Sequence, residues 1–153
     1  MEDMLKQAKL KALRLLTDMD RTEEQLRTKL KQKSYTDEVI DQAIQYVKSF
    51  GYIDDANYAM RFVENRKDSK SRQEIYAALS QRGVARDLIE QAMEECYTRD
   101  DEIQAIQALL EKKHFSPEYS TDAEKKKIYS YLLRKGFHYD DVRKVMQVSS
   151  WNV

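Results

Sequence analysis

The chain has 153 residues and no formal net charge, because 27 basic side chains offset 27 acidic ones. This balance excludes an overall field that would draw the protein onto nucleic acid or anionic lipid. With 3 glycines and 1 proline, the chain also lacks the turn residues that a strand-rich fold consumes. We therefore expect an all-α protein whose helices are joined by short polar loops.

Residues 1–51 form the first predicted unit, which contains three helices. Its second helix begins at a capping box, in which Thr22 and Gln25 can satisfy free backbone amides reciprocally. Apolar residues at helical spacing then follow in the second and third helices: Leu26, Leu30, Val39, Ile40, Ala43 and Ile44.

Residues 52–98 repeat this pattern without a gap, 49 positions further along the chain. Ser71 and Glu74 supply the capping box, and Arg82-Gly83 ends the second helix with a cation and a glycine suited to the left-handed conformation. The equivalent apolar residues are expected to form the core: Ile75, Leu79, Leu88, Ile89, Ala92 and Met93.

Residues 99–153 contain a third copy, shifted by a further 53 positions. Its capping box, Thr121 with Glu124, lies one turn earlier relative to the apolar residues, so we expect a longer second helix. The aligned positions are Ile128, Leu132, Gly136, Val142, Val145 and Met146, while Asp141 replaces the apolar Leu88. The pattern predicts three tandem three-helix repeats forming an elongated, curved helical array.

Catalytic chemistry finds little support in the sequence. His114 and His138 lie in different loops without ligands at metal-binding spacing, and the chain has no glycine-rich phosphate loop. The single cysteine, Cys96, continues an apolar helical stripe, which favours a buried small side chain over a reactive thiol. We expect no enzymatic activity, no cofactor and no metal.

Charges are segregated along the chain although their sum is zero. Basic residues recur on or beside the second helix of each unit, whereas residues 87–102 are mainly acidic. Such runs often only solvate the outer faces of helices, but a repeated basic face would also suit an acidic partner or a phosphate backbone. The candidate partner-binding residues are Lys29, Lys33, Arg66, Lys67, Lys70, Arg72, Arg82, Lys126 and Arg134.

The ten tyrosines are a second candidate for partner contact, or else lie at the boundaries of thin helical units.

The segment from Phe50-Gly51-Tyr52-Ile53-Asp54-Asp55 to Arg82-Gly83-Val84 resembles the signature of the RecX family of bacterial regulatory proteins. The segment Arg21-Thr22-Glu23-Glu24-Gln25-Leu26-Arg27-Thr28-Lys29-Leu30 is similar to the first repeat of that family. The segment Tyr129-Ser130-Tyr131-Leu132-Leu133-Arg134-Lys135-Gly136-Phe137 is similar to its last repeat. One departure is Lys70-Ser71, where many members carry a glycine before the helix.

The resemblance implies a regulator that binds the RecA protein and the RecA–DNA filament. It implies inhibition of filament growth, ATP hydrolysis and strand exchange, in DNA repair, recombination and the SOS response. We expect a monomer that acts in the cytoplasm without a membrane partner, since no segment approaches the roughly 20 apolar residues of a span and the acidic start is unlike a signal peptide.

Two alternatives remain open at this stage. Three-helix units with basic second helices can mimic helix-turn-helix modules, so the protein could contact DNA directly. The neutral net charge and the acidic run at 87–102 argue against DNA binding as the main activity and leave weak direct DNA contact as the alternative, because nonspecific affinity scales with the phosphates neutralised. The second alternative is a helical-repeat scaffold for other proteins.

Overall fold

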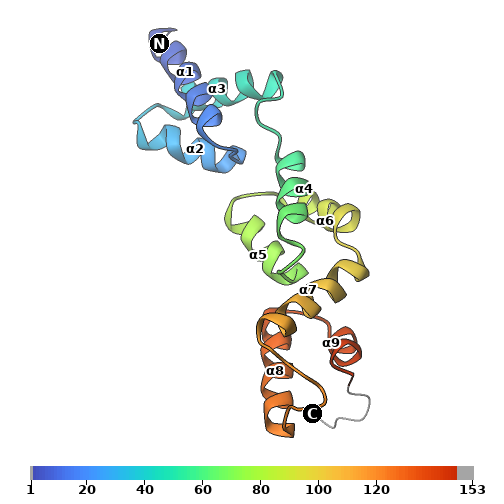
Figure 1. Ribbon diagram of the computed structural model, residues 1–153. Helices are drawn as coiled ribbons and strands as arrows, with labels where there is room; N and C mark the ends of the chain where they lie inside the picture. Colours follow the sequence, from blue (N-terminus) through green and yellow to red (C-terminus); the bar gives the residue numbers. More distant parts are fainter. Residues whose placement is uncertain (1, 148–153) are drawn as a thin grey trace. The chain divides into compact units, whose positions relative to one another are not determined.

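The computed structural model describes residues 2–147, which contain nine α-helices and no strand (Figure 1). The prediction of an all-α chain of three tandem three-helix repeats is confirmed. The helices are α1 (Glu2–Asp18), α2 (Glu23–Gln32), α3 (Asp37–Ser49), α4 (Asp55–Arg66), α5 (Arg72–Gln81), α6 (Arg86–Cys96), α7 (Arg99–Lys112), α8 (Asp122–Lys135) and α9 (Tyr139–Met146). None of these helices is both long enough and apolar enough to cross a membrane.

The chain forms two compact units, and each is described by itself. The first unit contains residues 1–61 with 79–90, and the second contains residues 62–78 with 91–153. Helices of the middle repeat therefore contribute to both units. The repeat boundaries after residues 51 and 98 stay a prediction.

The core of the first unit follows the predicted apolar stripes. Helices α1, α2 and α3 pack against one another (Figure 1). Small residues on α1 allow this close approach, since Ala8 and Ala12 are fully buried. The cluster contains Ala8, Ala12, Leu15, Leu26, Leu30, Val39, Ile40, Ala43, Ile44, Val47 and Ile53.

The second unit has its own core between α7, α8 and α9, and here two aligned positions differ from the prediction. Ile128 and Val145 are only partly buried, whereas Tyr129, next to Ile128, is 3% exposed. Tyr129 belongs to the buried cluster, and Ile128 packs against that cluster as a partly buried side chain. The cluster contains Ala105, Ile106, Leu109, Leu110, Tyr129, Leu132, Phe137, Val142 and Met146.

In the third repeat, Asp141 stands at the position of the apolar Leu88, and a contact with an arginine explains this replacement. Asp141 is buried, and its Oδ1 accepts a hydrogen bond from Nε of Arg99 (3.0 Å) and lies 2.9 Å from Nη2 of the same guanidinium. A buried carboxylate needs such a partner to offset the loss of water. In the middle repeat, Ile75, Leu79 and Ile89 are each buried as predicted.

The predicted caps are confirmed for α2 and α5 and are incomplete for α8. Thr22 with Gln25, and Ser71 with Glu74, each make both hydrogen bonds of a capping box. Thr121 accepts from the Glu124 amide, but the Glu124 carboxylate accepts from the Thr121 hydroxyl instead of the Thr121 amide. Helix α8 has 14 residues against 10 in α2 and α5, so the predicted extra turn is present.

The capping hydroxyls of α2 and α5 each make a second hydrogen bond to a distant helix end. The Thr22 hydroxyl donates to the Arg82 carbonyl at 2.5 Å, within the first unit. The Ser71 hydroxyl donates to the Lys135 carbonyl, within the second unit. Thr22 and Ser71 are both fully buried, whereas Thr121 is exposed. We call the Thr22–Arg82 and Ser71–Lys135 contacts the cap bridges.

A glycine follows the acceptor carbonyl in both cap bridges. Gly83 has φ 83° and Gly136 has φ 103°, and residues with a Cβ rarely adopt such positive φ angles. A Cβ on Gly83 would also collide with Glu24, and one on Gly136 would collide with Gln73. Glycine is therefore required by both the backbone conformation and the close approach of the other helix.

We predict that Thr22→Val destabilises the protein more than Thr121→Val. Valine keeps the shape of threonine but removes the hydroxyl. Thr22→Val therefore leaves both the Arg82 carbonyl and the capped backbone amide at the start of α2 without a hydrogen-bond partner. The expected loss is about 2–3 kcal/mol at Thr22, because a buried unsatisfied group adds to the lost cap. The loss at the exposed Thr121 should be about 1 kcal/mol. Urea unfolding followed by circular dichroism would measure both, and equal losses would contradict a structural role for the cap bridge.

Candidate partner-binding surface

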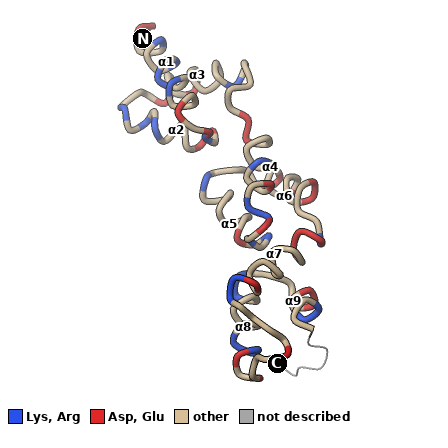
Figure 2. The backbone as a smooth tube through the Cα atoms, viewed as in Figure 1, with Lys and Arg blue, Asp and Glu red and all other residues tan. Residues whose placement is uncertain are grey.

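The nine candidate cations are divided between the two compact units. The first unit contains Lys29, Lys33 and Arg82, and the second contains Arg66, Lys67, Lys70, Arg72, Lys126 and Arg134. Figure 2 shows basic residues gathered on α2 and on α8. The expected single stripe across all three repeats stays a prediction.

Arg72, at the first position of α5, is held by groups of the fold. Its guanidinium lies 3.1 Å from Oε2 of Glu102, donates to the Tyr97 carbonyl at 3.1 Å, and lies 4.9 Å from the centre of the Tyr97 ring. Glu102 is only 4% exposed, and its other oxygen accepts from the His138 amide at 2.8 Å. Arg72 therefore compensates a buried carboxylate, and its contact with a partner stays a prediction.

Tyr97 connects this ion pair to the loop before α5. Its hydroxyl donates to the Lys70 carbonyl at 2.7 Å, and burial raises the pKa of the phenol well above its usual value. The phenol therefore stays protonated and keeps donating throughout the neutral range. The Tyr97 ring and the Arg72 guanidinium together hold the loop of Lys70 against α7.

Lys67 is also engaged within the protein. Its ammonium lies 3.1 Å from Glu64 and 3.5 Å from Asp101, and it donates to the Cys96 carbonyl at 3.3 Å. The hydrogen bond to Glu64 raises the pKa of Lys67 although burial opposes the shift. Cys96 itself is only partly buried, contrary to expectation, and burial raises the pKa of its thiol.

Two further candidates are partly covered by the protein. The Arg66 guanidinium stacks over the Phe62 ring at 3.6 Å from its centre. Arg82 is half-buried, and its carbonyl is the acceptor of a cap bridge. Both remain within reach of solvent, but part of each side chain serves the fold.

Five candidate cations are exposed and make no side-chain ion pair or hydrogen bond to any residue between 2 and 147. They are Lys29, Lys33, Lys70, Lys126 and Arg134. Their side chains are accessible to an acidic partner, and long-range attraction to such a partner depends on accessible cations. They form the best-supported part of the candidate surface, and we call them the free cations.

An exposed aromatic cluster at the end of α3 was not predicted as a group. The Tyr46 and Phe50 rings meet edge to face with centres 5.1 Å apart, and Phe50 stacks with Tyr52 at 5.7 Å. Phe50 and Tyr52 are both more than half exposed. The sequence places Phe50 and Tyr52 on either side of Gly51, but ring contacts cannot be read from spacing alone.

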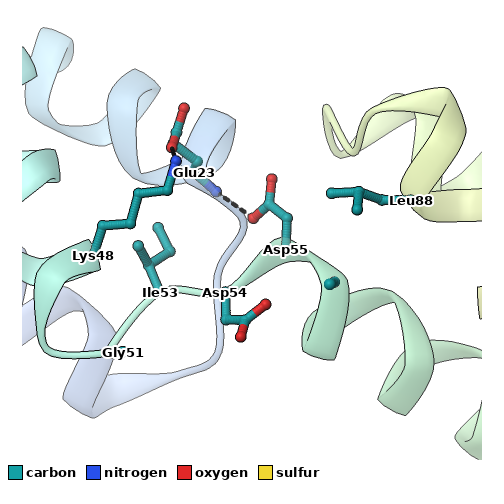
Figure 3. Close-up of a pocket in the computed structure, with 8 residues that line it drawn as sticks. Glu23, Lys48, Gly51, Ile53, Asp54, Asp55 and Leu88 are labelled. Atoms are coloured by element: carbon teal, nitrogen blue, oxygen red, sulfur yellow. Dashed lines mark hydrogen bonds and ion pairs between the residues drawn. The ribbon is translucent and has the colours of Figure 1, made fainter.

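A cleft of about 440 Å³ lies beside this segment in the first unit (Figure 3). The Lys48 ammonium lies 3.1 Å from the Glu23 carboxylate, and the Glu23 amide donates to Asp55 at 2.9 Å. Burial raises the pKa of Asp55 despite that hydrogen bond. These groups satisfy one another, and the Asp54 carboxylate caps α4 at Asn57. Each charged residue that lines the cleft therefore already has a partner within the protein.

Three family models match the chain in tandem. Their descriptions are RecX first three-helix domain at residues 8–46, second three-helix domain at 54–93 and third three-helix domain at 100–146. The Regulatory protein RecX of Caldanaerobacter subterraneus subsp. tengcongensis is 36% identical over 94% of this chain and 71% of the relative. The chain belongs to the RecX family. This is a family of regulatory proteins, which agrees with the expectation from the sequence.

Two further similarities describe the extent of the match. The Regulatory protein RecX of Clostridium botulinum strain Alaska E43 is 31% identical over 83% of this chain, which spans 61% of that relative. The crystal structure of RecX from Lactobacillus salivarius has the same fold, with TM-score 0.80 and 24% identity over 96% of this chain and 97% of that one. The resemblance stated from the sequence motifs is therefore confirmed.

We predict that Arg72→Ala destabilises the protein, whereas Arg134→Ala does not. The first change leaves the buried Glu102 without its cation, and we expect a loss of about 1–3 kcal/mol because Arg72 itself is half exposed. Arg134 is exposed and unpaired, so its removal should stay within about 0.5 kcal/mol. Melting curves of both variants test this, and identical curves would show that the Glu102 pair contributes nothing to stability.

Proposed function

We propose that this protein binds RecA and its nucleoprotein filament and restrains the ATPase and recombinase activities of RecA in DNA repair and recombination. The observation that carries the proposal is the tandem match to all three RecX three-helix domains. The protein would act as a cytoplasmic monomer and as a regulator without chemistry of its own. The motif resemblance of the junction around Gly51 supports the same partner.

Local patches of positive charge support binding to the RecA filament. Because the protein has no net charge, attraction to a filament must come from patches and not from the whole molecule. The free cations offer such patches, and a groove lined by acidic side chains and phosphates would be their complement. Lys67 and Arg72 would contribute indirectly, by holding the helices that carry the patches, while Arg66 and Arg82 would contribute at the edge of the contact.

The functional prediction is that the purified protein slows ATP hydrolysis by RecA on single-stranded DNA. Without RecA, the protein should neither hydrolyse ATP nor cut DNA. Steady-state phosphate release at increasing ratios of this protein to RecA would measure the effect. An unchanged rate at an excess over RecA would contradict the proposal and favour a scaffold for another partner.

The surface prediction concerns Lys126 and Arg134 of α8. The double variant Lys126→Gln/Arg134→Gln should fold normally but bind RecA filaments more weakly, chiefly through slower association and a smaller salt dependence. Surface substitutions of this kind usually change stability by less than about 0.5 kcal/mol. Surface plasmon resonance on immobilised filaments at two salt concentrations would measure the binding rates.

A matched control is Lys6→Gln/Lys144→Gln, which removes two other exposed lysines and gives the same change in net charge. Binding by this control should resemble that of the unaltered protein. If both double variants lost equal affinity, net charge would explain the effect. If the α8 variant kept full affinity and salt dependence, the contact would lie elsewhere, and the exposed aromatic cluster of Tyr46, Phe50 and Tyr52 would be the next candidate.

A further inference from the structure

The second unit contains a cleft of about 500 Å³ that shares only Lys70 with the free cations. Three separate segments line it: the loop before α5, the end of α7 and the C-terminal half of α8. The lining residues are Ser69, Lys70, Leu109, Lys112, Lys113, Tyr131 and Lys135. Four of these seven residues are lysines and none is acidic, so we call it the lysine cleft.

The fold uses only part of this positive charge. Lys135 lies 3.0 Å from the Glu74 carboxylate, and Lys113 lies 4.3 Å from the centre of the Tyr131 ring. Lys70 and Lys112 are exposed and make no ion pair within the described residues. Only one of the four lysines makes an ion pair among residues 2–147, and the lining itself contains no acidic residue, so the cleft keeps an excess of positive charge.

Two hydrogen bonds fix the walls of the lysine cleft relative to each other. The Tyr97 hydroxyl holds the Lys70 carbonyl at 2.7 Å, and the Ser71 hydroxyl donates to the Lys135 carbonyl. Both hydroxyls belong to buried residues. The backbones of two cleft lysines are thus attached to the core of the second unit, so the concave shape is part of the fold.

We propose that the lysine cleft binds a phosphate group of a nucleotide, either free or within a nucleic-acid strand. A concave site lined by one sign of charge concentrates counterions more strongly than a flat surface does. Lysines act toward phosphate as compact point charges, whereas planar bidentate recognition of carboxylates favours arginine. No arginine lines the cleft, so its chemistry fits phosphate better than an acidic peptide.

The Ser69 hydroxyl and the Tyr131 phenol add hydrogen-bonding groups that could bind a phosphate oxygen or a sugar. Leu109 provides an apolar surface between them. A volume of about 500 Å³ exceeds what a lone phosphate needs. The site would therefore accept a phosphate together with part of the nucleoside attached to it.

This inference does not depend on RecA, so the experiment uses the full chain alone. Fluorescence anisotropy would measure binding of a labelled single-stranded oligonucleotide at 50 and 200 mM salt, with unlabelled ATP as competitor. The test variant is Lys70→Gln/Lys112→Gln, which leaves the Glu74–Lys135 pair and the Tyr131 contacts intact. The control variant is Lys6→Gln/Lys144→Gln, with the same change in net charge.

Each phosphate neutralised on a single strand contributes about 0.7 to the slope of log affinity against log salt. If both lysines contact phosphates, the test variant should lose about 1.4 from this slope. Raising the salt from 50 to 200 mM lowers the affinity of each protein by some factor. That factor should be about sevenfold smaller for the test variant than for the unaltered protein. The control variant should keep the original slope, and melting curves should confirm that all three proteins fold.

The outcomes separate the possible ligands. If ATP displaces the strand, and does so only when Lys70 and Lys112 are present, the cleft binds free nucleotides. If the test variant loses strand binding but ATP does not displace the strand from the unaltered protein, the cleft binds nucleic acid. Both results support the proposal. It is overturned if the test variant binds the strand as tightly as the control variant, if the unaltered protein binds neither probe, or if a polyglutamate peptide displaces the strand as effectively as ATP does.

Discussion

A buried hydroxyl that serves two helices at once is the interaction on which the helical packing depends. Thr22 and Ser71 each accept a hydrogen bond at the start of one helix, which leaves the hydroxyl proton available. Each proton is then donated to the last turn of another second helix, at Arg82 or Lys135. Because both hydroxyls are fully buried, water cannot replace either partner. The sequence requirement is therefore a hydroxyl residue at one helix start and a glycine after the other helix end.

Charged side chains fall into two groups once their surroundings are considered. Glu102 and Asp141 are buried, so Arg72 and Arg99 are fixed by the need to compensate them. The free cations have no such partner among residues 2–147, so their substitution should leave the fold intact. A chain with 35% charged residues and no net charge therefore offers a basic surface only where such cations gather.

Much of the fold could be predicted from the sequence, whereas the candidate site could be predicted only in part. Caps and apolar spacing are local signals, and they located α2, α5 and the buried residues Leu26, Leu79 and Ile89. The exchange of Ile128 for Tyr129 in the core was missed because alignment to the other repeats cannot weigh ring volume. The role of Arg72 was missed because its partner Glu102 lies 30 positions away and looks like one more surface acid. The lysine cleft combines three segments whose lysines are unremarkable when taken one at a time.

The cap bridge and the lysine cleft are physically connected through adjacent residues. Ser71 makes the cap bridge to Lys135, and Lys70, directly before it, is held by the Tyr97 hydroxyl. Lys70 and Lys135 both line the cleft. The backbone that brings the second helices together therefore also sets the separation of two cleft cations. Mutual repulsion of these lysines opposes that arrangement, and the Glu74 carboxylate beside Lys135 offsets part of it. An anionic ligand would offset more, so binding at the cleft would stabilise the same helix contact that the Ser71 hydroxyl maintains.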